Sequence, residues 1–433
     1  MLPEDSVRGR VFTLASGTAL AQLITAGTAP IVTRLYSPDQ IGLLAVFMAF
    51  FGLWSSILAW RYESALLIAT DRNELRALFQ LAATLTVIMS VMSAPILYGL
   101  MSLGFFGFHL LPGWCAVAAV PIHIGYGFFM LYRACALRAG IVRQISKAAV
   151  TRSAFSAVSR VLLGLAGVGA AGLFAAEIAS AWAAMGALRG AVRERYGVLW
   201  SVPGFTTVSG TARRYAKFGK YEMPSVVINQ LALVIPVPLI AAFYGAAAAG
   251  WFGLARILVA LPNAQVGRAV SDVFQMELSQ SVKLGDRAAA RRLFYRLLRR
   301  LSLLGLLPMT IAMTCSPTLV PFVFGREWAP MGIIAALIAP WIYATLVVSS
   351  LSRVLSVLQR QEYKLIYDVS ALSLICAAFG AADRWSLGLM ATVSAVSAVG
   401  VVSYLIYLGI IIRVVSRDLC AAPTHEGRDK HGI

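Results

Sequence analysis

The sequence predicts an all-α membrane protein that crosses the bilayer about twelve times. Of its 433 residues, 59% are hydrophobic and only 13% are charged, whereas soluble domains contain about 25% charged residues. The mean hydropathy of +0.77 agrees with this composition. Long apolar runs recur along the whole chain, and basic residues gather in alternate connections between them. We therefore expect lipid to be the solvent for most of the chain.

Apolar runs define the predicted spans, since a membrane helix needs about 20 mostly apolar residues. The first run exceeds the roughly 7–15 apolar residues of a signal peptide and is interpreted as a span. The weakest runs are 150–168, 171–188 and 365–380. The predicted spans are 11–33, 41–60 or further, 77–101, 113–132, 150–168, 171–188, 221–243, 249–267, 301–324, 331–352, 365–380 and 387–412.

Lysine and arginine mark every second connection between these spans. The short connections 34–40, 102–112, 167–170, 244–248, 325–330 and 381–386 contain only Arg34, Arg326 and Arg384, while the chain has 37 such residues. Because basic residues stay on the cytoplasmic side, both termini are predicted to be cytoplasmic. This distribution accounts for most of the net charge of +18 without a nucleic-acid partner.

The segment 285–307 is the densest basic block. Arg292, Arg296, Arg299 and Arg300 recur at steps of three and four residues, which places them near one helix face. The simpler interpretation is an interfacial helix whose cations meet anionic headgroups. The alternative is that some of these arginines attract an anionic substrate at the inner mouth.

An internal repeat divides the chain into two halves of six spans. At an offset of 208 residues, five identities fall within one short window. The identical pairs are Gln22/Gln230, Leu23/Leu231, Pro30/Pro238, Tyr36/Tyr244 and Gly42/Gly250. Both halves start in the cytoplasm, so the repeat is parallel and a substrate path is expected between the halves. The predicted parts are an N-terminal lobe (1–188), a cytoplasmic linker (189–220), a C-terminal lobe (221–413) and a cytoplasmic tail (414–433).

Prolines are expected to interrupt two of the spans. Pro30 lies in the first span, and Pro236 and Pro238 lie in the seventh. Such breaks are tolerated where a cavity or a neighbouring helix satisfies the freed backbone groups. We therefore expect both helices to be loosened at these positions.

Motifs for catalysis and for cofactors are absent from the sequence. There is no GxxxxGK[ST] segment, so ATP hydrolysis is not expected, and there is no HExxH or paired-cysteine metal site. The five cysteines are expected to act as small buried hydrophobes without disulfides. The longest outer connection, 102–112, has His109 as its one titratable group, and His123 is expected to be a satisfied or cavity histidine. A transporter without cofactor or metal is therefore favoured over an enzyme.

Polar side chains inside the spans are the candidate site residues. They are Gln22, Arg160, Glu177, Asn229, Gln230 and Arg256. A charge at the bilayer centre costs at least about 2.5–3.5 kcal/mol, so it normally faces a cavity and serves a function. Arg256 lies roughly 11 Å from the outer end of its span. The alternatives are a structural pairing of Glu177 with Arg160 or Arg256, and hydrogen bonds between helices for Asn229 and Gln230.

The stretch "WRYESALLIA" (60–69) places an arginine and a glutamate within an apolar run. If the second helix continues to Ala69, Arg61 and Glu63 lie within the membrane. Residues two apart do not share a helix face, so we expect no pair between them and expect at least one to face another helix or an aqueous path. The alternative is that the helix ends at Trp60 and both charges are interfacial. At offset 208, Arg268 and Asp272 form a corresponding couple.

These segments resemble the opening of the Wzx-type oligosaccharide flippases of the MATE-like (MOP) exporter superfamily. That family combines a Tyr-Ser/Thr-Pro-x-x-ψ-Gly stretch with a later Arg-Tyr-Glu followed by an apolar run. The matching residues in "LYSPDQIGLLAVF" and "WRYESALLIA" are Tyr36, Ser37, Pro38, Gly42, Arg61, Tyr62 and Glu63. The family's Leu-Pro ending is replaced here by Ile68-Ala69.

The resemblance continues in the second half and covers most of residues 11–280. The matches there are Tyr244-Gly245, Ala255-Arg256 and Leu261-Pro262. Lys220 stands four residues before Pro224, one more than the family's spacing.

The resemblance implies two six-helix lobes in a V around a central cavity, and alternating access without ATP. It implies a bacterial inner-membrane flippase for a polyprenyl-diphosphate-linked oligosaccharide, used in O-antigen, capsule or exopolysaccharide assembly, with membrane lipids and other assembly proteins as partners. Arginines suit a diphosphate, and Gln, Asn and Tyr suit sugar hydroxyls. The expected cavity residues are Arg256, Arg61, Glu63, Arg160, Gln22, Asn229 and Gln230, with Glu177 as a buried partner.

Two other functions remain open. A MATE-type multidrug or ion antiporter would share the fold, but cationic drugs require acidic cavity residues, whereas Arg160 and Arg256 outnumber Glu177 here. A membrane polysaccharide polymerase or ligase would need a long outer loop, and the longest predicted one is 102–112.

Overall fold

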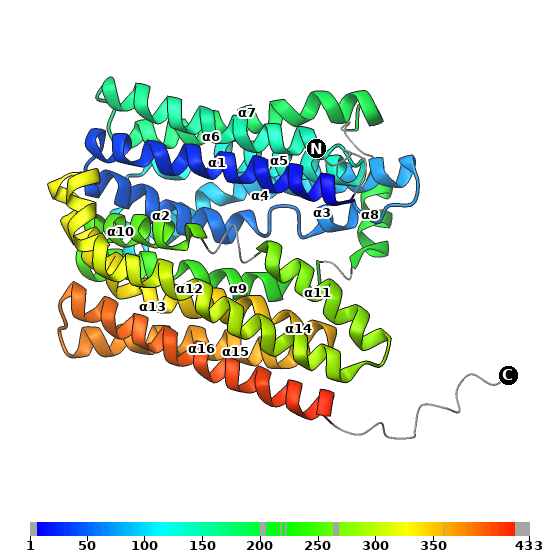
Figure 1. The fold of residues 1–433 in the computed structure, drawn as a ribbon. Helices are drawn as coiled ribbons and strands as arrows, with labels where there is room; N and C mark the ends of the chain where they lie inside the picture. Colours follow the sequence, from blue (N-terminus) through cyan, green and yellow to red (C-terminus); the bar gives the residue numbers. More distant parts are fainter. Residues whose placement is uncertain are drawn as a thin grey trace. The chain divides into compact units, whose positions relative to one another are not determined.

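The computed structural model describes residues 7–199, 205–216, 219–220, 223–262, 268–358 and 360–420. Within these residues the secondary structure is helical and no strand occurs (Figure 1). The helices are α1 (Val7–Leu35), α2 (Pro38–Ser55), α3 (Tyr62–Ala65), α4 (Arg72–Ser102), η1 (Phe106–Leu110), α5 (Trp114–Arg138), α6 (Val142–Leu165), α7 (Ala170–Tyr196), α8 (Phe205–Arg214), α9 (Met223–Val234), α10 (Pro236–Pro262), α11 (Arg268–Lys283), α12 (Arg287–Phe324), η4 (Arg326–Trp328), α13 (Ala329–Leu351), α14 (Arg353–Val357), α15 (Gln361–Arg384) and α16 (Leu389–Cys420).

The predicted all-α membrane fold is confirmed. Every predicted span overlaps a helix, and in the described part of the chain nine helical stretches are long and apolar enough to cross a membrane. One of them, Val226–Leu261, covers both the seventh and the eighth predicted spans. Only 11% of the apolar window of α12 is buried inside the protein, so the remaining apolar surface suits lipid.

The proline predictions have different outcomes. The seventh span is interrupted as expected, because α9 ends at Val234 and α10 begins at Pro236, which has no N–H to donate. The break expected at Pro30 is wrong, since α1 continues through it. A single proline removes one backbone hydrogen bond, and the turns on either side of Pro30 remain helical.

The turn between the seventh and eighth spans lies inside α10. Gly245 has φ 86° and ψ 176°, a conformation that glycine adopts without the steric cost of a Cβ. The glycine of the Tyr-Gly motif is therefore a backbone requirement of this turn.

The cysteine prediction is correct for two residues and wrong for two others. Cys115 and Cys135 are buried, whereas Cys315 on α12 and Cys376 on α15 are exposed. Their helices are poorly covered by the rest of the protein, with 11% and 29% of the apolar windows buried. All four thiols are free.

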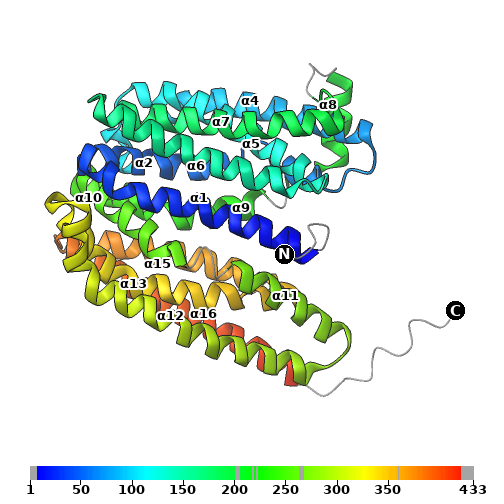
Figure 2. The same cartoon turned by 45° about the horizontal axis from the view of Figure 1, so that its top comes forward.

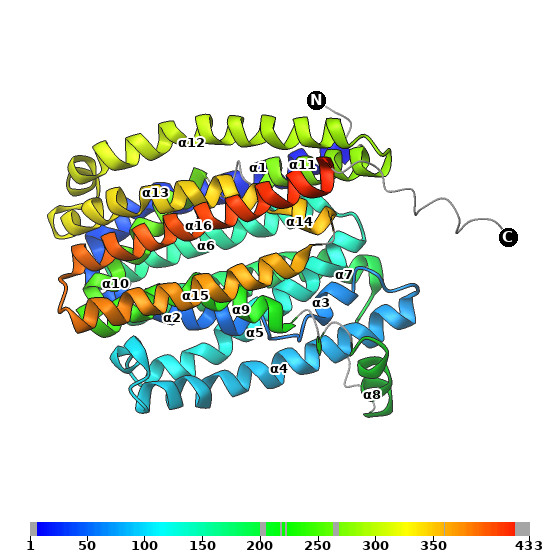
Figure 3. The ribbon, with the colours of Figure 1, turned by 90° about the horizontal axis from the view of Figure 1, so that it is seen from below.

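The chain divides into two compact units. The first unit comprises Met1–Ala255 and Thr318–Gly332, and the second comprises Arg256–Pro317 and Ile333–Ile433. In the first unit α1 packs on α6, α6 on α7, α7 on α5 and α5 on α4 (Figure 2). In the second unit α15 and α16 lie side by side (Figure 3). The lobe, linker and tail boundaries expected from the repeat stay a prediction.

Each unit has its own apolar core. The core of the first unit includes the fully buried side chains of Leu66 directly after α3, Phe79 of α4 and Leu131 of α5. The core of the second unit is built on α11, α12 and α16, with Leu278, Phe294 and Ile411 among its buried members. This packing leaves the polar residues discussed below near helix ends or between neighbouring helices.

The Tyr-Ser-Pro motif is a helix start. Ser37 caps α2: its hydroxyl accepts a hydrogen bond from the N–H of Gln40, and the Gln40 side chain accepts one from the N–H of Ser37. Pro38 occupies the first turn, where its fixed φ suits the helix and its missing N–H is not needed. Tyr36 donates a hydrogen bond to the carbonyl oxygen of Arg160 on α6, at 2.9 Å.

A close helix crossing in the first unit supports the internal repeat. A Cβ on Gly42 of α2 would lie 1.8 Å from the carbonyl oxygen of Ala246 on α10, and a Cβ on Gly250 would lie 2.3 Å from that of Pro38. At offset 208, Pro38 is equivalent to Ala246 and Gly42 to Gly250. The contact is therefore reciprocal, as expected where two equivalent helices cross at a pseudo-two-fold axis.

Candidate functional site

The Arg-Tyr-Glu stretch forms a turn, so the prediction that the second helix continues past Trp60 is wrong. Helix α2 ends at Ser55, and Trp60 and Arg61 have positive φ values of 48° and 65°. The hydroxyls of Ser55 and Ser56 donate to the carbonyl oxygens of Gly52 and Leu53, which competes with the helical hydrogen bonds of this last turn. Left-handed residues cannot continue a right-handed helix.

Arg61 and Glu63 are ion-paired, which corrects the expectation that residues two apart do not meet. The Arg61 Nη1–Glu63 Oε1 distance is 2.8 Å, and Arg61 Nη2 donates to Ser64 Oγ at 3.1 Å. The left-handed backbone at Arg61 removes the helical spacing on which that expectation depended. The two side chains are 25% and 16% exposed, so the guanidinium is held in a fixed, partly accessible position. That it faces a substrate path stays a prediction.

Tyr62, the central residue of the motif, connects this turn to the linker. Its side chain is buried, and its hydroxyl donates to the carbonyl oxygen of Ala212 on α8 at 3.2 Å. The motif therefore has two roles in the fold: Tyr62 anchors α8, and the Arg61–Glu63 pair closes the turn.

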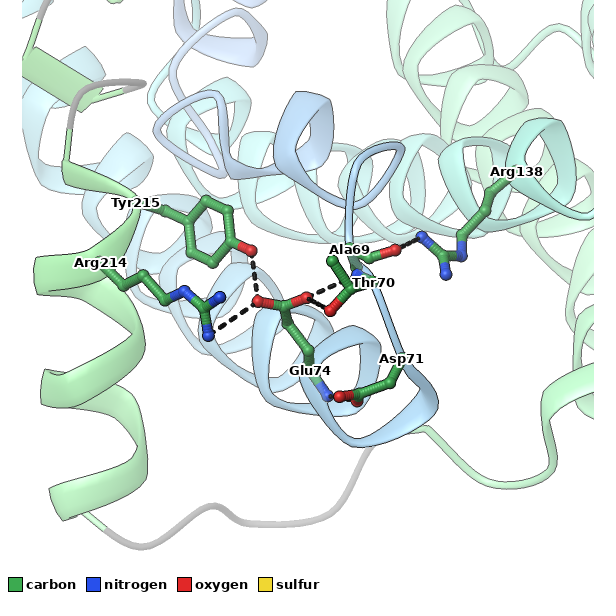
Figure 4. A network of polar contacts seen from close by, with 7 residues as sticks. All are labelled: Ala69, Thr70, Asp71, Glu74, Arg138, Arg214 and Tyr215. Atoms are coloured by element: carbon green, nitrogen blue, oxygen red, sulfur yellow. Dashed lines mark hydrogen bonds and ion pairs between the residues drawn. The ribbon is translucent and has the colours of Figure 1, made fainter.

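Glu74, in the first turn of α4, binds the linker at the end of α8 (Figure 4). Its carboxylate accepts hydrogen bonds from the N–H and hydroxyl of Thr70, at 2.5 and 2.7 Å, and from the Tyr215 hydroxyl, at 2.5 Å. Arg214 lies 3.1 Å from the same carboxylate, and Asp71 caps α4 by accepting from the N–H of Glu74. Burial, and then the hydrogen bond to Glu74, raises the pKa of Tyr215 above its ordinary value, so Tyr215 remains a donor at neutral pH.

Two arginines fix the chain on either side of this network. Arg138 of α5 donates to the carbonyl oxygen of Ala69 (Figure 4), and Arg72 donates to that of Tyr196 at 2.6 Å. Sequence reasoning missed Glu74. Asp71 followed by Glu74 three residues later has the spacing of a helix capping box, which could have predicted the start of α4 but not the contact of Glu74 with Tyr215.

Removing the Glu74 side chain is expected to release α8 from the first unit. Glu74→Ala leaves the Thr70 and Tyr215 donors without their acceptor, and such losses cost about 1–3 kcal/mol. Hydrogen–deuterium exchange of Phe205–Arg214 should become about tenfold faster. Glu194→Ala, which removes an exposed glutamate of α7, is the matched control and should leave the exchange unchanged. Equal exchange in both variants would contradict the anchoring role.

Arg160 and Glu177 form an ion pair between α6 and α7, in which Glu177 is buried and the Arg160 side chain is 23% exposed. The predicted pairing of Glu177 is therefore confirmed for Arg160. Glu177 is only 5% exposed, and the nearby Tyr36 hydroxyl bonds to the backbone of Arg160. A buried carboxylate in this position compensates the charge of Arg160, so the pair is part of the packing of these two helices.

The predicted amides have different surroundings. Gln230 on α9 donates to the carbonyl oxygen of Gly52 on α2 at 3.2 Å, so it hydrogen-bonds between helices, as the alternative for this residue predicts. Gln22 on α1 and Asn229 on α9 are half-buried. Their role toward a sugar stays a prediction.

Arg256 lies in the second unit, half-buried on α10, where it interacts electrostatically with Tyr404 of α16. Its alternative pairing with Glu177 stays a prediction. The equivalent couple, Arg268 and Asp272, lies on α11, and the side chains of both residues are outside the described part of the chain.

A polar cluster on α15 and α16 was not predicted. Lys364 pairs with the buried Asp368 at 2.7 Å, and the Tyr367 ring stacks on that of Tyr407 at 3.9 Å between centroids. The sequence carried a weak signal for this pair: Lys364 and Asp368 are four residues apart, the spacing at which side chains on a helix meet. Among the described residues, no group of three or more His, Cys, Asp or Glu side chains could hold a metal ion.

Comparisons with known proteins agree with this architecture. A sequence model of a family described as "Polysaccharide biosynthesis protein" matches residues 31–333. No curated protein sequence matches the chain.

Solved structures give the same result for the fold. The chain is similar to an inward-facing multidrug resistance MATE family transporter of the MOP superfamily (TM-score 0.64, 14% identity, 95% of this chain and 96% of that chain). It is similar to the lipid II flippase MurJ in an inward closed conformation (TM-score 0.66, 11% identity, 93% and 90%). A third is a MOP superfamily transporter from Pyrococcus furiosus (TM-score 0.63, 14% identity, 96% and 97%). These similarities establish a MOP-type fold.

Proposed function

Because the chain belongs to the family of polysaccharide biosynthesis proteins, we propose that it is a flippase for a polyprenyl-diphosphate-linked oligosaccharide. The observation that carries the proposal is the family match over residues 31–333, which includes the Arg-Tyr-Glu turn and Arg256. Transport would take the lipid-linked oligosaccharide from the inner to the outer leaflet of a bacterial inner membrane, with both termini in the cytoplasm. The product would serve O-antigen, capsule or exopolysaccharide assembly, together with other assembly proteins.

The charges of the spans support an anionic substrate. Arginine presents a planar fork of donors that matches phosphate oxygens, so Arg256 and Arg61 are the proposed diphosphate ligands. Arg61 is already oriented by Glu63 at 2.8 Å, which reduces the entropy lost on binding. Arg61 and Arg160 each have a carboxylate partner, and Arg160 is assigned the secondary role because its partner Glu177 is more deeply buried than Glu63, with side chains 7% and 16% exposed. Gln22, Asn229 and Gln230 supply amide groups for sugar hydroxyls.

A multidrug or ion antiporter is the second candidate function. The observation that favours it is the buried carboxylate of Asp368, which is 8% exposed and has Lys364 as its partner. A cationic substrate would have to displace Lys364 from this carboxylate. The basic side chains of the spans make the flippase the stronger proposal.

Deletion of the gene in its native host tests the proposal. We expect lipid-linked repeat units to accumulate on the cytoplasmic side and surface polysaccharide to disappear, and a plasmid copy of the chain should restore it. The control is drug susceptibility of the same strain, which should not change. Unchanged surface polysaccharide together with increased drug sensitivity would favour the antiporter instead.

A further inference from the structure

The second unit contains a cleft between α11 and α12 that the proposed transport reaction does not use. The two helices follow one another along the chain and contribute the buried residues Phe274, Leu278 and Phe294 to the same apolar core. The residues lining the cleft include Glu277, Gln280, Ser281, Leu284, Arg292 and Arg296. The α12 side of this lining is therefore cationic, and the α11 side contains amide, hydroxyl and carboxylate groups.

The two arginines of the cleft are available to a ligand. Arg292 and Arg296 are four residues apart, so they lie on one face of α12, and both are exposed. Within the residues that the structure describes, neither guanidinium forms an ion pair or a hydrogen bond. By contrast, Arg291, which does not line the cleft, lies over the Tyr295 ring at 6.0 Å.

The length of α12 places the cleft at the membrane surface. This helix has 38 residues, so it is about 57 Å long, whereas the hydrocarbon core is about 30 Å thick. The apolar part begins at Leu301, and Arg296 lies roughly 8 Å before it along the helix. Arg296 is therefore at the height of the lipid headgroups, and Arg292, about 6 Å further from the apolar part, lies on their water side.

An apolar surface of α11 adjoins the cleft on its membrane side. Val273 and Met276 are 50% and 65% exposed, and their spacing of three residues puts them near one face of α11. Leu284, at the turn between α11 and α12, lines the opposite, water-side end of the cleft. A ligand with a phosphate and an acyl chain would contact both parts at once.

The acceptors in the cleft specify the headgroup further. The Ser281 hydroxyl donates to the carbonyl oxygen of Glu277 at 3.0 Å, so its oxygen is left as an acceptor. The Glu277 carboxylate is a second acceptor and carries a negative charge. Together they suit a hydroxyl group beside the phosphate and repel a headgroup with further negative charge.

We propose that this cleft binds a glycerophospholipid whose single phosphate is flanked by a hydroxyl-bearing headgroup. Arg292 and Arg296 contact the phosphate oxygens with the Gln280 amide beside them, Glu277 and Ser281 accept from the headgroup hydroxyl, and the acyl chain lies on Met276 and Val273, on the membrane side of the arginines. The site is independent of the proposed function, because its ligand is a structural lipid and not the transported one.

The test measures lipid binding by the full-length protein in nanodiscs of phosphatidylcholine containing phosphatidylglycerol. We expect Arg292→Gln with Arg296→Gln to weaken phosphatidylglycerol binding about tenfold, because charge-assisted hydrogen bonds to the phosphate are lost. The matched control is Arg299→Gln with Arg300→Gln, which removes the same charge from exposed positions of the same helix outside the cleft. Equal weakening by both pairs would overturn the proposal, since it would indicate general surface charge.

A second arm distinguishes a structural lipid from a substrate-like diphosphate. Farnesyl diphosphate is added as competitor, and we expect it to displace phosphatidylglycerol poorly because Glu277 repels the extra charge. Glu277→Gln should weaken phosphatidylglycerol and strengthen farnesyl diphosphate by a few-fold each. Displacement by farnesyl diphosphate at lower concentration than by phosphatidylglycerol itself would overturn the assignment. Binding is measured without transport, so a failure here is separable from a failure of the flippase proposal.

Discussion

Replacing Gly42 with alanine is expected to prevent the close crossing of α2 and α10 and to remove most of the folded protein from the membrane. The new Cβ would lie 1.8 Å from the carbonyl oxygen of Ala246 and 2.5 Å from its carbonyl carbon. Both are backbone atoms, so no side-chain rotation relieves the overlap. Overpacking of a core costs about 1–3 kcal/mol when side chains can adjust, and here we expect the upper end or more.

The measurement is the amount of monodisperse protein after membrane extraction, together with its thermal midpoint. Gly99→Ala on α4 is the matched control, because a Cβ there has no neighbouring atom within 4 Å. It should be neutral or slightly stabilising, since alanine is the better helix former. The repeat adds an internal check: Gly250→Ala should be about as damaging as Gly42→Ala, since its Cβ would lie 2.3 Å from the Pro38 carbonyl oxygen. Normal yield of Gly42→Ala would contradict the close crossing.

The second large effect is expected at Arg256. Arg256→Ala should lower surface polysaccharide at least tenfold while the protein still inserts at normal abundance, because a lost charge-assisted contact with a phosphate is worth about 1.5–3 kcal/mol. Arg256→Lys should recover part of the activity, since a point charge still attracts phosphate but lacks the bidentate fork. The measurements are surface glycan on gels and protein abundance by immunoblot.

A control variant separates this role from a general loss of charge. Arg384→Ala removes an exposed arginine of the same unit from the end of α15, and it should leave glycan export unchanged. A structural role for Arg256 would instead reduce the abundance of the Ala variant. Normal export by Arg256→Ala at normal abundance would exclude Arg256 as a substrate ligand.

The family motifs of the first half have structural roles in the fold. Ser37 and Pro38 start α2, Gly42 permits the crossing with α10, and Tyr62 anchors α8. Arg61 is the motif residue that combines a fixed position with partial exposure. It therefore remains the best motif candidate for contact with a substrate.

The helices themselves were determined by local sequence. A run of about 20 apolar residues has to satisfy its backbone hydrogen bonds internally when lipid surrounds it, so α4, α5 and α13 could be predicted from composition alone. The break at Pro236 was predicted from its missing N–H, but this property alone does not decide a break, because α1 continues through Pro30. The offset of 208 likewise indicated that Gly42 and Gly250 are equivalent.

Tertiary structure decided which of these residues meet. The sequence by itself determined the spans, their repeat and the polar residues within them, whereas the reciprocal contact of Gly42 with Gly250 and the partners of Glu74 depend on helices more than 100 residues apart. The Arg61–Glu63 pair needed the left-handed turn at Trp60 and Arg61, which no local preference of these residues predicts and which the surrounding contacts stabilise. Lipid and local hydrogen bonding specify where a helix forms, but the packing of the helices specifies which side chains come together.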